Sequence, residues 1–126
     1  MKKIIQTNDA PAPIGPYSQA TQVGNLLFFS GQIAIDPADG SLKIGDLETE
    51  TRQVMDNIGA ILRSQNLDYA HIVKSSIFLK NMDDFVQINE IYGSYFSENY
   101  PARETVQVAR LPKDVNVEIS VIVVAG

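Results

Sequence analysis

Residues 101–126 constrain the fold most, because they contain two runs with the side-chain alternation of β-strands. In the first run, Arg103, Thr105 and Gln107 share one face, and Val106 and Val108 share the other. In the second run, one face holds Val117, Ile119, Val121 and Val123, and the other holds Asn116, Glu118 and Ser120. Residues 111–114 between the runs contain a proline and an aspartate, which favour chain reversal. The pattern predicts a hairpin of two strands at this end of the chain.

Arg103 and Glu118 are unusual choices for a purely structural sheet, because a charge held near a sheet needs a partner. The Arg103 guanidinium is a planar fork suited to a carboxylate, and its alternative role is a structural ion pair. Glu118 interrupts an apolar strand, where it could hold a water molecule or move a proton if burial raised its pKa. Its alternative role is a salt bridge to Arg103 or Arg110. The pattern alone leaves both alternatives open.

The rest of the chain predicts further strands and two helices. The strands are expected at residues 3–6, 17–23, 26–35 and 72–80, and the helices at residues 47–65 and 82–98. Asp46 and Asn81 are suited to cap the helices, and Gly24-Asn25 is suited to a tight hairpin turn. Ser30-Gly31 breaks an apolar strand, which indicates a β-bulge or a close approach to the backbone. The order predicts an α+β domain that covers residues 1–126.

Two helices can cover only one face of such a sheet. Residues 26–29 and 121–124 are nevertheless apolar on both faces. The uncovered face must be buried against something, and another copy of the chain is the simplest candidate. The sequence therefore predicts a homo-oligomer.

Composition and motifs exclude several classes of function. With 126 residues, a net charge of −5 and scattered cations, the chain has no basic stripe for nucleic acid. It has no cysteine and one histidine, His71, which is expected to be a surface or capping residue, so we expect no metal site. No P-loop, GxGxxG or GxSxG motif is present. The N-terminus has no apolar segment typical of a signal peptide and no stretch fits a membrane span, so we expect a cytoplasmic protein.

Three segments together resemble the Rid family, the reactive intermediate deaminases, which are also called YjgF-like or endoribonuclease L-PSP proteins. They are IGPYSQA (14–20), FFSGQIAIDP (28–37) and PARETVQVARLPKDVNVEI (101–119). The resemblance implies a chorismate-mutase-like fold, with a mixed six-stranded sheet and two helices on one face. It also implies a homotrimer with active sites between subunits. The implied activity is hydrolysis of 2-imino acids to 2-keto acids and ammonia, without a metal or organic cofactor.

The resemblance also assigns roles to individual residues. It implies that Arg103 holds the substrate carboxylate and that Glu118 positions the attacking water. The residues implied to line the cleft are Tyr17, Ser30, Gly31, Asn89 and Thr105. Two positions depart from the family pattern: Thr105 stands where many relatives have cysteine, and Ser120 where a second acidic residue often follows. Any proton transfer is therefore expected to depend on Glu118 alone.

Three functions remain open at this point. The first is a 2-iminobutanoate/2-iminopropanoate deaminase. The second is a non-catalytic trimer that senses keto acids or binds a regulatory partner through the same pocket. The third is the endoribonuclease of the family's older name, which the net charge of −5 and the single histidine disfavour.

Overall fold

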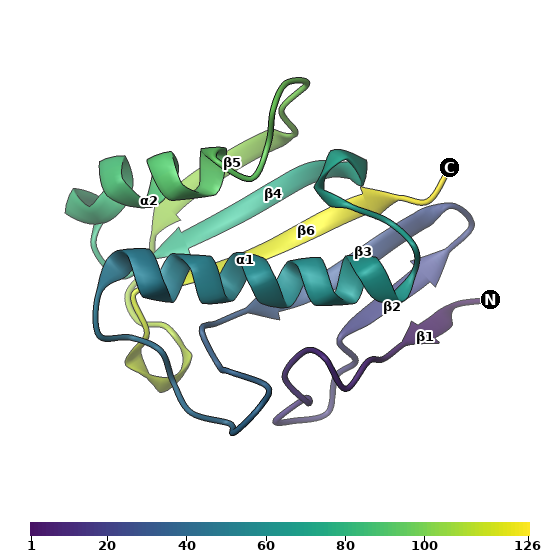
Figure 1. The fold of residues 1–126 in the computed structure, drawn as a ribbon, viewed down its shortest axis with the longest axis horizontal. Helices are drawn as coiled ribbons and strands as arrows, with labels where there is room; N and C mark the ends of the chain where they lie inside the picture. Colours follow the sequence, from purple (N-terminus) through teal and green to yellow (C-terminus); the bar gives the residue numbers. More distant parts are fainter.

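The computed structural model describes residues 1–126, which form one mixed sheet with both α-helices on the same face (Figure 1). The strands are β1 (Lys3–Ile5), β2 (Ala20–Val23), β3 (Leu26–Gln32), β4 (Ile72–Leu79), β5 (Ala102–Gln107) and β6 (Val117–Val124). Their order across the sheet is β1-β2-β3-β6-β4-β5, and only the β4–β5 pair is parallel. The helices are α1 (Leu47–Ser64) and α2 (Phe85–Gly93), and three short 3-10 helices are η1 (Tyr69–His71), η2 (Met82–Asp84) and η3 (Pro112–Asp114). The predicted α+β class, six strands and one-sided helix layer are confirmed.

α1 has almost the predicted bounds. The Asp46 carboxylate accepts a hydrogen bond from the Thr49 N–H at 2.8 Å, as its N-cap position predicts. The apolar stripe of α1 faces the sheet and is completely buried; it consists of Val54, Ile58, Ile61 and Leu62. Three polar residues of α1, Glu50, Thr51 and Asn57, are also buried, and Glu50 and Asn57 hold segments near the candidate site.

α2 is shorter than predicted, because it ends at Gly93 rather than continuing to Glu98. Ser94 follows, and its hydroxyl donates to the Ile91 carbonyl at 2.6 Å, competing with the backbone for that acceptor. At the other end, Asn81 accepts from the Asp83 N–H at 2.9 Å, but the segment that it caps is η2. Phe85 and Tyr92 therefore belong to α2, whereas Tyr95 and Phe96 lie in the segment after it.

The predicted C-terminal hairpin is wrong, because β4 lies between β5 and β6 (Figure 1). β6 is buried along the whole of its helix-facing side, so it needs a central place with a neighbour on each side. β5 carries exposed charged residues, which suit an edge strand. The nine residues from Val108 to Asn116 are long enough to connect two strands that are not neighbours.

β3 contains the predicted β-bulge. Phe29 pairs with Val121 and Gln32 pairs with Ile119, so Ser30 and Gly31 together lie opposite one residue of β6. β3 ends at Gln32 and β2 begins at Ala20, so both strands are shorter than predicted. The bulge lies at the end of β3 that borders the N-terminal loop.

The second face of the sheet is uncovered in the single chain, as predicted. Leu26 and Phe28 of β3 are 39% and 42% exposed there, and Val106 of β5 is 41% exposed. Neither helix is long and apolar enough to cross a membrane.

Candidate functional site

The first candidate cavity has a volume of about 320 Å³ and lies where the β3 bulge, β6 and the N-terminal loop meet. It is lined mainly by apolar groups, with four of the predicted site residues among them. Its lining includes Ile14, Tyr17, Gln19, Ser30, Gly31, Ile33, Ile35 and Glu118. No lysine, arginine or histidine lines it.

Glu118 is the ionisable group of this cavity. Its side chain is half-buried and forms neither a hydrogen bond nor an ion pair within the chain, and burial raises the pKa of its carboxyl group. Within the chain Glu118 does not form the alternative salt bridge: Arg110 pairs with Asp114 at 2.8 Å, and Arg103 contacts Asn89. A carboxyl group in this state can accept a proton near neutral pH more readily than an exposed one.

Gly31 lets the Glu118 side chain lie against its backbone. A Cβ atom on residue 31 would lie 2.8 Å from Glu118 Cδ, closer than carbon atoms can approach. The interruption of β3 therefore has both meanings that its sequence allowed, a bulge and a close approach.

The N-terminal loop that forms the opposite wall is held by Gln19, which is only 2% exposed. Its amide group donates to the carbonyls of Thr7, Ala10 and Pro11 at 3.0, 3.3 and 2.9 Å, and its oxygen accepts from the Thr7 N–H at 2.7 Å. Ser30 ties the bulge to the same loop, because its hydroxyl donates to the Ser18 carbonyl at 2.6 Å. The half-exposed Tyr17 extends from this loop, and its hydroxyl accepts from the Ile14 N–H at 3.3 Å.

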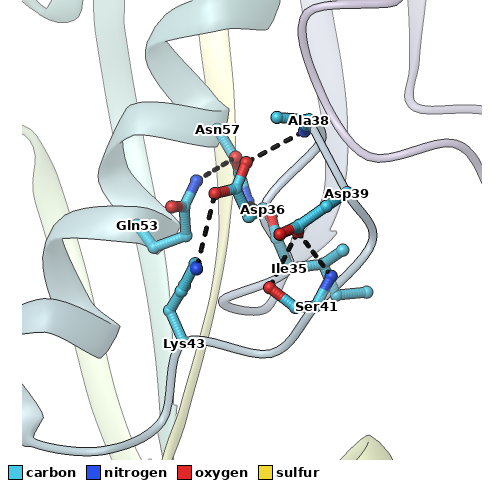
Figure 2. A network of polar contacts seen from close by, with 8 residues as sticks. All are labelled: Ile35, Asp36, Ala38, Asp39, Ser41, Lys43, Gln53 and Asn57. Atoms are coloured by element: carbon cyan, nitrogen blue, oxygen red, sulfur yellow. Dashed lines mark hydrogen bonds and ion pairs between the residues drawn. The ribbon is translucent and has the colours of Figure 1, made fainter.

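A third wall, residues 33–35, is held from α1. Asn57 is 1% exposed and donates to the carbonyls of Ile33 and Ile35 at 3.1 and 2.9 Å. Figure 2 shows two further polar contacts around this wall. The Gln53 amide donates to Asn57 Oδ1 at 2.9 Å, and the Lys43 ammonium group pairs with the Asp36 carboxylate, the residue after Ile35, at 3.7 Å. Asn57 therefore ties the loop after the bulge to α1.

The second candidate cavity, of about 420 Å³, lies under α2 beside the edge strand β5. Its lining residues are Asn89, Tyr92, Gly93, Tyr100, Pro101 and Arg103. Arg103 is exposed, and its Nη1 donates to Asn89 Oδ1. Its guanidinium carbon lies 5.5 Å from the Phe85 ring centre and 5.6 Å from that of Tyr92. Within the chain Arg103 forms no ion pair, so its alternative role as a structural ion pair has no partner there.

Thr105 follows Arg103 on the same face of β5 but lines neither cavity. It pairs in register with Ile77, and its hydroxyl oxygen is buried without a hydrogen-bond partner. Thr105 is thus close to the second cavity in sequence, but its hydroxyl is not presented to a ligand in the single chain.

The two cavities lie on opposite faces of the sheet. Arg103 is in register with Ser75, whose side chain is buried beneath α2. Glu118 lies between Val117 and Ile119, which are buried on the helix side, so its own side chain points to the uncovered face. The structure therefore brings four predicted site residues together in one cavity, Tyr17, Ser30, Gly31 and Glu118, and places Arg103 and Asn89 in the other.

Comparison with known proteins places the chain in a family. The model of the family described as Endoribonuclease L-PSP matches residues 7–125. The chain belongs to this family, which is also called the Rid or YjgF family. It is 51% identical to a RutC family protein of Pyrococcus horikoshii over 97% of each chain. It is 44% identical to the 2-iminobutanoate/2-iminopropanoate deaminase of Mus musculus, over 100% of this chain and 93% of the mouse protein.

Solved structures of family members have the same fold. The Escherichia coli protein TdcF, determined with bound serine, superposes with a TM-score of 0.93 at 41% identity, over 98% of this chain and 99% of TdcF. In our protein, no three His, Asp or Glu side chains lie close enough together to hold a metal ion.

Sequence reasoning missed the buried residues that hold the walls of the first candidate cavity. Gln19 and Asn57 have no charge and stand in no motif, yet both are buried and bind backbone carbonyls of the cavity walls. Asn57 could have been found, because it is a polar residue within the apolar stripe of a helix. His71 is the predicted capping residue: with Asp68 it forms a capping box at η1.

Proposed function

We propose that this protein hydrolyses 2-imino acids, with 2-iminobutanoate and 2-iminopropanoate as the substrate class, to 2-keto acids and ammonia. Arg103 holds the substrate carboxylate, and Glu118 positions and deprotonates the attacking water. The reaction takes place where the Arg103 cavity of one copy meets the Glu118 cavity of another, in a homotrimer. The mouse relative named as a 2-iminobutanoate/2-iminopropanoate deaminase, 44% identical over this whole chain, supports the choice of reaction.

The observation that carries the proposal is that Arg103 and Glu118 are both without an ion-pair partner, each in its own cavity. A guanidinium that no protein carboxylate neutralises is available for a ligand carboxylate. A half-buried carboxyl group without a partner is available for a water molecule. Because the cavities lie on opposite faces of one sheet, a substrate that contacts both groups requires two copies.

The chemistry needs only these two groups. Water attacks the imine carbon while the Glu118 carboxylate takes one of its protons; a carbon–oxygen single bond forms, and the carbon–nitrogen double bond becomes a single bond whose freed electron pair goes to the nitrogen. Glu118 returns the proton to the nitrogen, which gives a carbinolamine. Glu118 then takes the hydroxyl proton and passes it to the nitrogen, the carbon–nitrogen bond breaks with its electron pair on nitrogen, and the hydroxyl oxygen becomes the keto oxygen as ammonia leaves. Arg103 contributes orientation, which keeps the imine carbon within reach of the water. Tyr17, Asn89 and Ser30 line the two halves of the proposed cleft, with Gly31 beside Glu118 and Thr105 behind Arg103.

The test is a coupled assay in which a pyridoxal-phosphate enzyme generates the imino acid in place and keto-acid formation is followed. The wild-type protein should accelerate the reaction, and Arg103→Ala should lower kcat/KM by about 100-fold, the size of a lost charge-assisted contact. Arg52→Ala is the matched control, because Arg52 is an exposed arginine that pairs with Glu48 on the outside of α1. Equal acceleration by Arg103→Ala and wild type would refute the mechanism.

A second function is favoured by the bound serine of TdcF, which shows that a family member accepts a small amino acid. On this reading the same composite pocket of our protein binds a keto or amino acid without turnover and reports its concentration to a partner. Calorimetric binding of 2-oxobutanoate by a protein that does not accelerate imine hydrolysis would establish it. The endoribonuclease reading gains no support from the cavities, since Arg103 is the single cation that lines either of them.

A further inference from the structure

We infer that Phe85 and Tyr92 of α2 are positioning residues, which hold the Arg103 guanidinium in the orientation that receives the substrate carboxylate. The inference rests on the proposed function and extends it to residues that do not touch the reacting atoms. It assigns the aromatic side of α2 a purpose beyond packing.

The guanidinium is held on three sides by side chains of one helix. Phe85, Asn89 and Tyr92 are spaced four and three residues apart, so they share the face of α2 that looks onto β5. The Arg103 guanidinium carbon lies 5.5 Å and 5.6 Å from the two ring centres, within the range of a cation–π contact. Asn89 accepts one of its N–H groups, and the remaining donors stay free.

Tyr92 is fixed to β4, the strand that pairs with β5. Its side chain is 4% exposed, and its hydroxyl donates to Ser75 Oγ at 2.8 Å. Ser75 is completely buried and is the register partner of Arg103 on β4. The ring under the guanidinium is therefore tied to the residue beside Arg103. Burial raises the pKa of Tyr92, so the hydroxyl remains a donor at neutral pH.

The segment that leads into α2 is tied to β5, the strand that carries Arg103. Gln107, which shares a face of β5 with Arg103, accepts from the Met82 N–H at 2.7 Å. η2 leads directly into Phe85. β5 therefore binds the helix at two places, through Gln107 before Phe85 and through Arg103 along the Phe85–Tyr92 face.

Aromatic partners suit this purpose better than a carboxylate does. Arg52 and Arg110 each pair with a carboxylate four residues away, at 3.0 and 2.8 Å, and those pairs occupy the donors. Two rings restrict the guanidinium without neutralising it or using its N–H groups. The structure thus keeps a full positive charge and several donors directed at the cavity.

The inference predicts a defect in binding rather than in chemistry. Tyr92→Leu and Phe85→Leu should each raise KM about fivefold to tenfold, the scale of one partly desolvated cation–π contact, with kcat changed less than twofold. The affinity for 2-oxobutanoate, measured by calorimetry, should fall by the same factor. Tyr92→Phe keeps the ring and loses the hydroxyl, so it should restore most of the affinity. Tyr95→Leu is the control, because Tyr95 packs against Tyr69 and does not contact Arg103.

The outcomes separate this inference from the proposed function. Wild-type affinity and KM in Phe85→Leu and in a folded Tyr92→Leu, while Arg103→Ala abolishes binding, would overturn the inference and leave the function standing. Equal losses in Tyr95→Leu would also overturn it, since they would show a general packing effect. If Tyr92→Leu does not fold, Phe85→Leu and Tyr92→Phe decide the question. A wild-type protein that neither turns over imino acid nor binds 2-oxobutanoate would overturn both.

Discussion

Arg103 and Glu118 are both ionisable, both placed on strands and both without an ion pair, but the chain holds them in opposite ways. Arg103 stands on an edge strand, exposed to solvent, with aromatic rings and an amide around its guanidinium. Glu118 stands on a central strand, half-buried, with the backbone of Gly31 against it and no hydrogen-bond partner. One group keeps its charge, and the other is moved toward its neutral form.

The difference indicates two tasks. A permanently charged group that is held at the surface can bind an anion on first contact, without a change in protonation. A carboxyl group with a raised pKa can take up and return a proton during a reaction near neutral pH. The first task is needed for binding and the second for the chemical step, so substitutions in the two regions should produce different kinetic defects.

The sharpest test of this contrast is Glu118→Gln, which keeps the size of the side chain but removes its ability to accept a proton. We expect kcat to fall by about 100-fold or more, the usual contribution of a general base, with KM nearly unchanged. Arg103→Ala should act mainly on KM. Initial rates over a range of imino-acid concentrations measure both values. If the two variants changed kcat and KM in the same way, binding and the chemical step would not be separated between the two regions.

The next test asks whether the two regions act in one chain or across two. Arg103→Ala and Glu118→Gln protomers, each inactive alone, should regain activity when they are unfolded together and reassembled. In randomly mixed trimers with sites between neighbours, about a quarter of the sites would combine an intact Arg103 with an intact Glu118. The same two variants refolded separately and then combined without exchange are the control. No recovery from trimers shown to be mixed would refute a site that combines Arg103 of one copy with Glu118 of another.

The sequence predicted the parts of this contrast that depend on alternation and on local chemistry. Alternation placed Arg103 and Glu118 on strands and gave the face of each within its strand. The Ser30-Gly31 interruption predicted the bulge, and the Asp46 cap predicted the start of α1. These features are decided by neighbours in the chain, so one sequence is enough to find them.

The features that sequence reasoning missed depend on contacts between distant segments. Alternation does not say which strands pair, so the wrong hairpin put β5 and β6 side by side and would have put Arg103 and Glu118 on neighbouring strands. Nothing local shows that Asn57 binds the Ile33 carbonyl, 24 positions away, or that Glu50 accepts from the Asn116 N–H, 66 positions away. Separation of the two cavities is likewise a property of the assembled sheet.

The smallest expected effect concerns stability, where the two regions should have opposite signs. Burial raises the pKa of Glu118 above its value in the unfolded chain, about 4.3 for a glutamate. The native state then holds the proton more tightly, so ionisation of Glu118 costs stability as the pH rises through the folded pKa, and the cost is complete above it. Glu118→Gln removes that cost, and the variant should be slightly more stable than wild type at pH 7 but not at pH 4.

Arg103→Ala should instead lower stability by about 0.5–1 kcal/mol at both pH values, because it removes the contacts of the guanidinium with Phe85 and Tyr92. Urea unfolding at one fixed protomer concentration measures both variants, since assembly makes the midpoint depend on concentration. A Glu118→Gln variant that is less stable than wild type at pH 7 would mean that the carboxylate is stabilised in the assembled protein. Its surroundings would then include a cation from another copy, and the site would be closed even without substrate.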